Sequence, residues 1–197
     1  MKKVKISVLI IAALFVFLAC NDSMKPVEYL AWVENAKNKL KINKHTKSAD
    51  YELQYEPTAY KAIKVHNIHE LTGKKFRTQK KSFQQLSHFL LQVKFHQKPV
   101  ENERDVSEYL AFDYKDRIRL VSQTDTLDRT ALYHLESSSS IYPYHKILFA
   151  YPRKSIKGSF SIILDKNKLD NEQVIFRFSG KNIKKAEKIN INIQQEL

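Results

Sequence analysis

From Leu86 onward, apolar and polar positions alternate along the chain with the period of a β-strand. In residues 86–96, apolar side chains such as Phe89, Leu91 and Val93 fall on one side, and mostly polar ones fall on the other. Shorter segments with this pattern, each bounded by turn residues, are 117–121, 131–136, 145–151, 159–165, 172–178 and 189–193. Strands of this number and spacing predict a mainly β, α+β fold built on an antiparallel β-sandwich or a barrel-like sheet.

The segment 50–56 shows the same alternation nearer the N-terminus. Tyr51, Leu53 and Tyr55 form its apolar side. The opposite side, which includes Gln54 and Glu56, is expected to face water, as one face of an antiparallel sheet often does. This segment is therefore predicted to be a half-buried strand.

Two short helices are predicted in the N-terminal part. One begins at Pro26, because proline is tolerated in the first helical turn and Tyr29 and Val33 share a helical face. The other begins near Pro57. We interpret residues 37–47 as a loop with a weak strand, 72–75 as a turn that leads into a basic loop ending at Lys81, and 107–114 as a strand or a short helix.

Residues 1–20 have the organisation of an export signal. Lys2, Lys3 and Lys5 precede an uncharged run, residues 6–19, that ends at Cys20. As a helix this run would reach ~21 Å, short of the ~30 Å hydrocarbon core of a bilayer, so it suits a signal peptide better than a membrane span. We therefore expect a signal peptide over 1–19, a short tether over 20–25, and a single mostly β domain over 26–197.

The residues Leu18, Ala19 and Cys20 resemble the lipobox of bacterial lipoproteins. The resemblance implies that Cys20 is lipidated and becomes the first residue of the mature chain. It places the protein in the cell envelope, anchored to a membrane, with the outer membrane expected and the leaflet left open. Because Cys20 is the only cysteine, the chain forms no internal disulfide, and its stability must come from packing.

The formal net charge is +13, and much of the excess lies in residues 61–98. There the only acid is Glu70, and the basic residues are Lys61, Lys64, Lys74, Lys75, Arg77, Lys80, Lys81, Lys94 and Lys98. Such a segment is either a solvated face or a binding site for the phosphates of anionic lipid or glycan. Nucleic acid is not expected as a partner of an exported chain. The candidate polyanion-binding residues are Lys74, Lys75, Arg77, Lys80 and Lys81.

Two motifs are weak candidates for metal binding. His66 and His69 stand at i and i+3, which places them on one face of a helix, but two ligands do not complete a site. The segment 165–172 is acidic, but it lacks the glycine that a calcium-binding EF-hand loop requires and suits a turn between two strands better. We predict neither a metal site nor a cofactor.

A run of four serines, from Ser137 to Ser140, allows a hydrolase as an alternative. His134 or His145 would be the base, but the chain has no Gly-x-Ser-x-Gly motif and only three glycines. Next to this run, Tyr142 and Tyr144 are candidate aromatic contacts for a ligand. No catalytic residue is assigned.

The motifs Leu30-Ala-Trp-Val-Glu-Asn35 and Ile141-Tyr-Pro-Tyr144 resemble the landmarks of a group of exported lipoproteins of Bacteroidota. That group has no assigned activity, so the resemblance implies an envelope location and no site residue. The function expected from the sequence is a non-enzymatic binding or structural module with an envelope protein or a glycan as partner. The alternatives are a serine hydrolase and a binder of anionic lipid or glycan phosphate.

Overall fold

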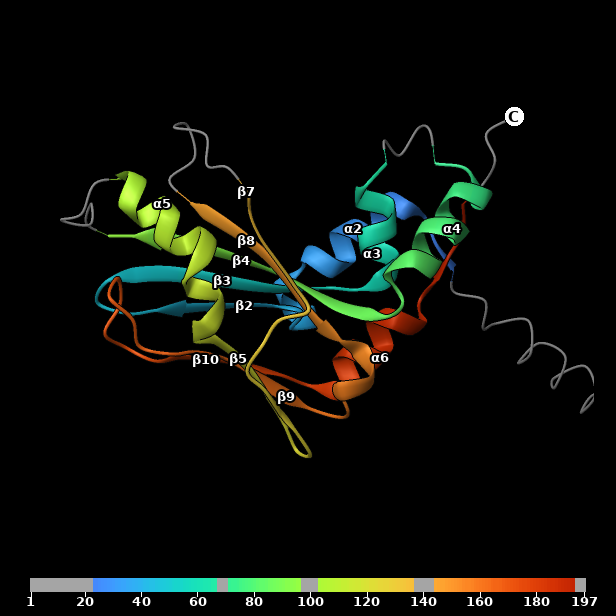
Figure 1. Cartoon of the computed structure of the whole chain (residues 1–197). Coiled ribbons are helices and arrows are strands. Elements are labelled where there is room, and N and C mark those ends of the chain that lie inside the picture. Colours follow the sequence, from blue (N-terminus) through green and yellow to red (C-terminus); the bar gives the residue numbers. More distant parts are fainter. Residues whose placement is uncertain (1–22, 67–70, 97–102, 137–143, 194–197) are drawn as a thin grey trace, which may run out of the picture.

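The computed structural model describes residues 23–66, 71–96, 103–136 and 144–193, and most of its strands form two antiparallel sheets (Figure 1). The larger sheet has the strand order β2-β3-β4-β8-β7, and the smaller has the order β10-β9-β5-β6. A separate parallel pair joins β1 to β11. The predicted α+β class with antiparallel sheets is confirmed, and the described strands form open sheets instead of a closed barrel.

Most strands agree with the alternation in the sequence. The segment 50–56 is the core of β3, and 86–96 is β4 with one residue fewer. The strands are β1 (Ser23–Met24), β2 (Lys41–His45), β3 (Ala49–Glu56), β4 (Leu86–Phe95), β5 (Ile118–Ser122), β6 (Thr126–Leu127), β7 (Leu132–Glu136), β8 (His145–Pro152), β9 (Phe160–Leu164), β10 (Val174–Phe178) and β11 (Asn190–Ile191).

The described residues contain five α-helices, more than the sequence predicted. Four of them, α2, α3, α4 and α6, gather at one end of the sheets, and α5 lies near the other end (Figure 1). The helices are α2 (Pro26–Glu34), α3 (Thr58–Lys64), α4 (Gly73–Phe83), α5 (Glu103–Phe112) and α6 (Gly180–Lys188), with short 3-10 turns η1 (Ala36–Asn38), η3 (Tyr114–Arg117) and η4 (Arg153–Ser155).

The helix predicted at Pro26 is α2, and the one predicted near Pro57 is α3. The expected turn over 72–75 and the basic loop that follows it to Lys81 are wrong, because Thr72 caps α4 and the residues from Gly73 onward lie within this helix. The expected final strand is also wrong in part: α6 occupies the residues before it, and β11 contains only Asn190–Ile191. The undecided segment 107–114 is mostly helix α5.

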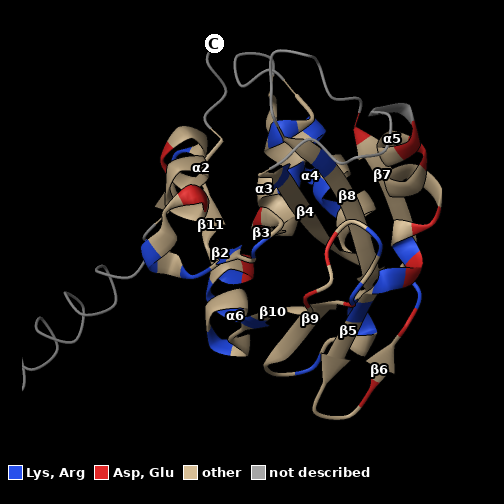
Figure 2. Cartoon of the chain, turned by 90° about the vertical axis from the view of Figure 1, so that its left-hand side faces the viewer, with Lys and Arg blue, Asp and Glu red and all other residues tan. Residues whose placement is uncertain are grey.

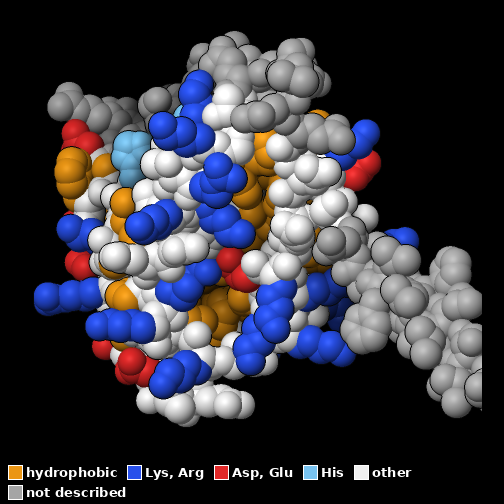
Figure 3. Space-filling view, turned by 90° about the vertical axis from the view of Figure 1, so that its right-hand side faces the viewer, with side chains coloured by type: hydrophobic (Ala, Val, Ile, Leu, Met, Phe, Trp, Pro, Cys, Tyr) orange, Lys and Arg blue, Asp and Glu red, His pale blue; other side chains and the backbone are white. Residues whose placement is uncertain are grey.

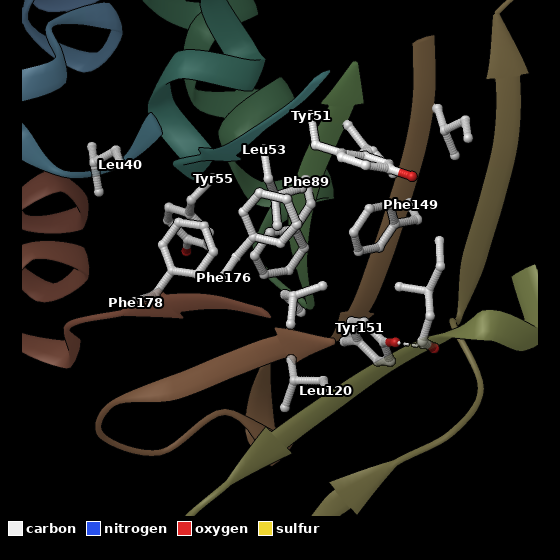
Figure 4. Close-up of a cluster of buried hydrophobic side chains, with 14 of the residues drawn as sticks. Leu40, Tyr51, Leu53, Tyr55, Phe89, Leu120, Phe149, Tyr151, Phe176 and Phe178 are labelled. Carbon is white, nitrogen blue, oxygen red and sulfur yellow. Dashed lines mark hydrogen bonds between the residues drawn. The ribbon is translucent and has the colours of Figure 1, made fainter. Parts of the chain in front are cut away.

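The core lies where the two sheets face each other. Phe89 of β4 is fully buried, and its ring stacks on that of Phe149 of β8 with 5.3 Å between centroids. Its edge contacts reach the smaller sheet at Phe160 and Phe178, at 5.9 Å each. Figure 4 shows Phe89 and Phe149 of the larger sheet and Phe178 of the smaller sheet pointing into the same cluster. Aromatic burial of this kind is a large contribution to stability in a chain without an internal disulfide.

The outer side of β3 differs from the prediction. Gln54 and Glu56 were expected to face water, but they are 4% and 5% exposed. The reason is that helices α3 and α4 cover this end of the sheet: Lys61 of α3 reaches Glu56, and Phe83 of α4 contacts His88 of β4. Polar groups are therefore buried between the sheet and the helices, where they need partners.

Candidate functional site

Helix α4 displays the basic segment on the surface. Thr72 caps its N-terminus, because its side-chain oxygen accepts a hydrogen bond from the backbone N–H of Lys75 at 3.2 Å. Phe76 is buried and fixes one side of the helix against the protein, while the rest of the helix is largely polar. Its cations are Lys74, Lys75, Arg77, Lys80 and Lys81, and no ion pair among the described residues includes any of them.

Helix α6 adds a second row of cations at the same end of the molecule. Lys181, Lys184, Lys185 and Lys188 are exposed. The ammonium of Lys185 lies over the ring of Trp32, 5.5 Å from its centroid, which links α6 to α2. Figure 3 shows the face that carries these helices, with many Lys and Arg side chains around a strip of apolar surface and few acids. We call the five cations of α4 and the four lysines of α6 together the basic face.

The other described cations of the segment 61–98 have partners within the protein and are not counted in the basic face. Lys61 binds Glu56 at 2.9 Å, and Lys64 lies 3.9 Å from Glu34. Lys94 lies over the ring of Tyr144, and Lys98 lies outside the described residues. The sequence segment therefore divides into structural cations and the exposed cations of α4.

The described chain begins beside the basic face. Ser23 and Met24 form β1, which pairs in parallel with Asn190 and Ile191 of β11, immediately after α6. The first described residues are thus held next to α6, whose lysines belong to the basic face. A tether at the N-terminus would emerge on this side of the molecule.

Acidic residues are concentrated elsewhere. In Figure 2, which shows the opposite face, Asp and Glu are seen on α5 and on the segments that border β6 and β7. These elements lie within residues 103–136, where acids outnumber bases. Acids are therefore frequent on the face opposite the basic face, while Glu28 and Glu34 of α2 are exposed at the same end as α4 and α6.

Beneath the basic face lies a cluster of buried polar groups. Glu56 and His88 are cross-strand partners on β3 and β4, and Gln54 is two residues from Glu56 on the same side. His88 is 4% exposed, and neither ring nitrogen has a hydrogen-bond partner among the described residues; the same is true of the Gln54 amide nitrogen. Unpartnered groups at this depth are costly, at about 1–3 kcal/mol each, unless water or a ligand satisfies them.

His88 is held in its neutral form. Burial, together with the nearby charges of Lys61 and Arg153, lowers the pKa of its imidazole to about 4, while Glu187 acts in the opposite direction. A buried ring beside two cations cannot accept a proton without unfavourable desolvation and repulsion. At neutral pH the cluster therefore contains an uncharged histidine between two ion pairs.

Besides the ion pair between Lys61 and Glu56, a second ion pair, between Arg153 and Glu187, connects α6 to this cluster. The Oε1 atom of Glu187 accepts hydrogen bonds from the Tyr55 hydroxyl at 2.7 Å, the Thr58 backbone N–H at 3.1 Å and the Arg153 guanidinium at 3.1 Å. The same guanidinium donates to the Thr58 hydroxyl at 2.6 Å. This network positions α6, and hence its lysines, relative to β3 and α3.

The structure gives little support to a metal site. Of the two histidines at i and i+3, His66 is described and His69 is not. In the predicted acidic turn, the carboxylate of Asp165 accepts two hydrogen bonds from the guanidinium of Arg119. The carboxylate of Asp170 accepts hydrogen bonds from the hydroxyls of Thr46 and Tyr51, so both carboxylates have protein partners. Among the described residues, no group of three or more potential ligands is arranged to hold a metal.

The remaining sequence candidates are placed only in part. The serine run, Tyr142 and Cys20 lie outside the described residues, and so the hydrolase geometry and the lipidation are not seen here. His134 is exposed on β7, His145 begins β8, and Tyr144 contacts Lys94. None of the described helices is long and apolar enough to cross a membrane.

Sequence reasoning missed the buried cluster because its members come from separate elements. Glu56, His88, Arg153 and Glu187 belong to β3, β4, η4 and α6. The sequence contained one indication of this buried face. Leu90 lies on the same side of β4 as His88, so that side of the strand is not uniformly polar. An apolar residue there indicates that something covers this face of the sheet.

Comparison with known proteins adds no family assignment: no family model, curated protein or solved structure matches the chain.

Proposed function

We propose that this protein is a lipid-anchored cell-envelope module whose basic face binds a phosphate-bearing surface, either anionic lipid headgroups or phosphorylated glycan. The observation that carries the proposal is the position of the basic face. Helix α4 contains no acidic residue, and its cations lie at the same end of the molecule as the lysines of α6. The first described residues are paired with β11, directly after α6. An anchor at Cys20 would keep this face close to the membrane.

The contribution of these cations to membrane binding depends on their distance from the membrane surface. The tether from Cys20 to the first described residue, Ser23, spans only about 10 Å even when fully extended. Each lysine or arginine that reaches an anionic membrane gains ~1 kcal/mol, and the attraction fades beyond ~8 Å at physiological salt. In this proposal, the short tether would hold several cations of the basic face within that range at once.

The strip of apolar surface between the cations supports the same function. In Figure 3 it lies in a hollow with Lys and Arg on its borders. A surface with both cations and apolar side chains is better suited to bind at the boundary between lipid headgroups and acyl chains than to bind a polar glycan polymer in water. Lipid headgroups are therefore the first partner to test.

The proposal is tested with charge reversal in a chain that starts at Asn21, so that acyl chains do not mask the effect. All described elements lie within this chain. The test variant is Lys74→Glu, Lys75→Glu, Lys80→Glu and Lys81→Glu. The matched control changes net charge equally at exposed positions outside α4 and α6: Lys47→Glu, Lys115→Glu, Arg129→Glu and Lys166→Glu.

Binding is measured by co-sedimentation with phosphatidylglycerol vesicles at two salt concentrations. We expect the unchanged chain and the control to bind, more tightly at low salt, and the α4 variant to bind weakly. Equal loss in the control and the α4 variant would show that net charge alone matters. Soluble phosphorylated glycan, added as a competitor, distinguishes the two sources of phosphate.

A further inference from the structure

A cavity of about 250 Å³ lies between the edge strands of the two sheets, β2 and β10. Its walls include Lys44 and Thr46 from the β2 side and Val174, Ile175 and Arg177 from β10, with Glu172 at the turn before β10. None of these residues belongs to the basic face, so the cavity is a separate feature of the molecule. Its volume is below that of sites for drug-sized ligands, which suits a smaller molecule.

Two cations, Lys44 and Arg177, line the cavity. No ion pair among the described residues includes Lys44 or Arg177, although both line the same space. His45 also lines it, but its Nδ1 is already bonded to Asp50 at 2.8 Å. Two unpaired cations in one cavity favour a carboxylate or phosphate group as a ligand.

A carboxylate in the same wall restricts the choice further. Glu172 accepts a hydrogen bond from the backbone N–H of Lys47 at 3.0 Å, and no cation forms an ion pair with it among the described residues. A simple anion would be repelled by this carboxylate. A ligand that also carries a positive group would satisfy both signs of charge.

Both strand edges offer unused backbone groups. The hydrogen bonds Tyr55 N–H to Leu40 and Thr46 N–H to Ala49 fix the register of β2, so the backbone of Asn43 and His45 points away from β3. By the same alternation, the bond from Asp165 N–H to Arg117 places the outward groups of β10 at Ile175 and Arg177. Donors and acceptors at these edges match those of a peptide.

The wall beside the cavity is fixed by buried bonds. Asp170 is 2% exposed, and its carboxylate accepts hydrogen bonds from the hydroxyls of Thr46 and Tyr51, both at 2.6 Å. A further bond from the Glu172 backbone N–H at 3.0 Å holds the turn. A site whose walls are already ordered loses little entropy when a ligand binds.

We propose that this cavity binds a small zwitterion of amino-acid or dipeptide size. Its carboxylate binds Lys44 and Arg177, its ammonium group binds Glu172, and its short apolar part lies on Val174 and Ile175. Unpaired backbone groups of β2 and β10 bind the peptide or amide atoms. This inference does not depend on the proposed function of the basic face.

The experiment is saturation-transfer NMR on the full chain in detergent micelles, with mixtures of free amino acids and of dipeptides as probes. We expect at least one member of the mixtures to receive saturation. Its N-acetyl and C-terminal amide derivatives, which each remove one charge, should bind about tenfold to a hundredfold more weakly, as should the protein variants Arg177→Ala and Glu172→Gln.

The exposed Lys166→Ala variant is the matched control, and it should bind the probe as the unchanged chain does. Circular dichroism checks that each variant is folded. The absence of saturation transfer to any probe at millimolar concentration would overturn the proposal. Equal binding of the acetylated and amidated derivatives, or equal loss in the Lys166 control, would overturn it as well.

Discussion

The ring of Phe83 on α4 lies edge-on against the imidazole of His88 on β4, with 5.4 Å between the ring centroids. This contact joins the most basic helix of the protein to a buried, uncharged histidine. Lys80, on the same helix, lies over the ring of Phe76 at 5.8 Å. The surface that we propose to bind phosphate therefore lies over the buried cluster, which α4 contacts through Phe83.

Acidification should destabilise the protein through His88. The folded-state pKa of about 4 lies below the ordinary value of 6.5, so protons bind the unfolded chain more tightly. Stability is then lost as the pH falls from about 6.5 to about 4, by up to about 3 kcal/mol at ~1.4 kcal/mol per pH unit. Urea unfolding of the unchanged chain and of His88→Gln measures this, and the variant should lose less stability across that range. Parallel curves for the two proteins would contradict the assignment.

His96 should titrate in the opposite direction. Its Nε2 and the Nδ1 of His45 each lie 2.8 Å from Oδ1 of Asp50. The hydrogen bond to Asp50 raises the pKa of His96, and the bonds to both histidines lower the pKa of Asp50. The stability contributed by His96 is present below its ordinary pKa and is lost as the pH rises through the folded value. In proton NMR titrations, Asp50→Asn should move the midpoint of His96 downward and leave that of His88 in place.

The interface between the sheets should depend strongly on Phe89. This side chain is fully buried and contacts Phe149, Phe160 and Phe178, so Phe89→Ala removes contacts to both sheets. We expect a loss of about 3–5 kcal/mol in the free energy of unfolding. Phe112→Ala is the control, because Phe112 is 67% exposed, and its effect should be within about 0.5 kcal/mol. Urea unfolding measures both, and similar losses would contradict this description of the core.

Gly180, the first residue of α6, should not tolerate a larger side chain. A Cβ atom there would lie 2.5 Å from the backbone carbonyl of Gly158, whose φ of +74° favours glycine. Gly180→Ala should therefore cost about 1–3 kcal/mol and displace α6. Gly73→Ala, at the start of α4, places its Cβ no closer than 3.7 Å to any neighbour and should be neutral or slightly stabilising. Thermal unfolding distinguishes the two, and equal melting temperatures would contradict the close approach.

Strands were more predictable from the sequence than helices. The alternation of Phe89, Leu91 and Val93 survives in β4 because one side of that strand faces the aromatic core. Helix α4 was missed because it buries little: Phe76 is its only buried residue, and its many lysines give a pattern that also fits a loop. A helix of this kind is held by its cap and by a few tertiary contacts, which a single sequence does not reveal.

The candidate sites were predictable only where local sequence determined them. The cations of α4 could be grouped from the sequence because they are adjacent in the chain, and the structure places them on one helix. Their binding of phosphate stays a prediction. The buried partners Glu56 and Lys61 were not, because alternation placed Glu56 on a solvent-facing side. The cavity between β2 and β10 depends on how two sheets meet, and no local pattern contains that information.

The central claim is that the basic face lies on the membrane, and site-specific labelling tests it most directly. A chain that starts at Asn21 has no cysteine, so Lys81→Cys on α4 and Lys166→Cys on the turn between β9 and β10 each accept one fluorescent label. With phosphatidylglycerol vesicles that carry a lipid-bound quencher, we predict strong quenching at position 81 and little at position 166. Equal quenching at the two positions, or stronger quenching at 166, would contradict the claim.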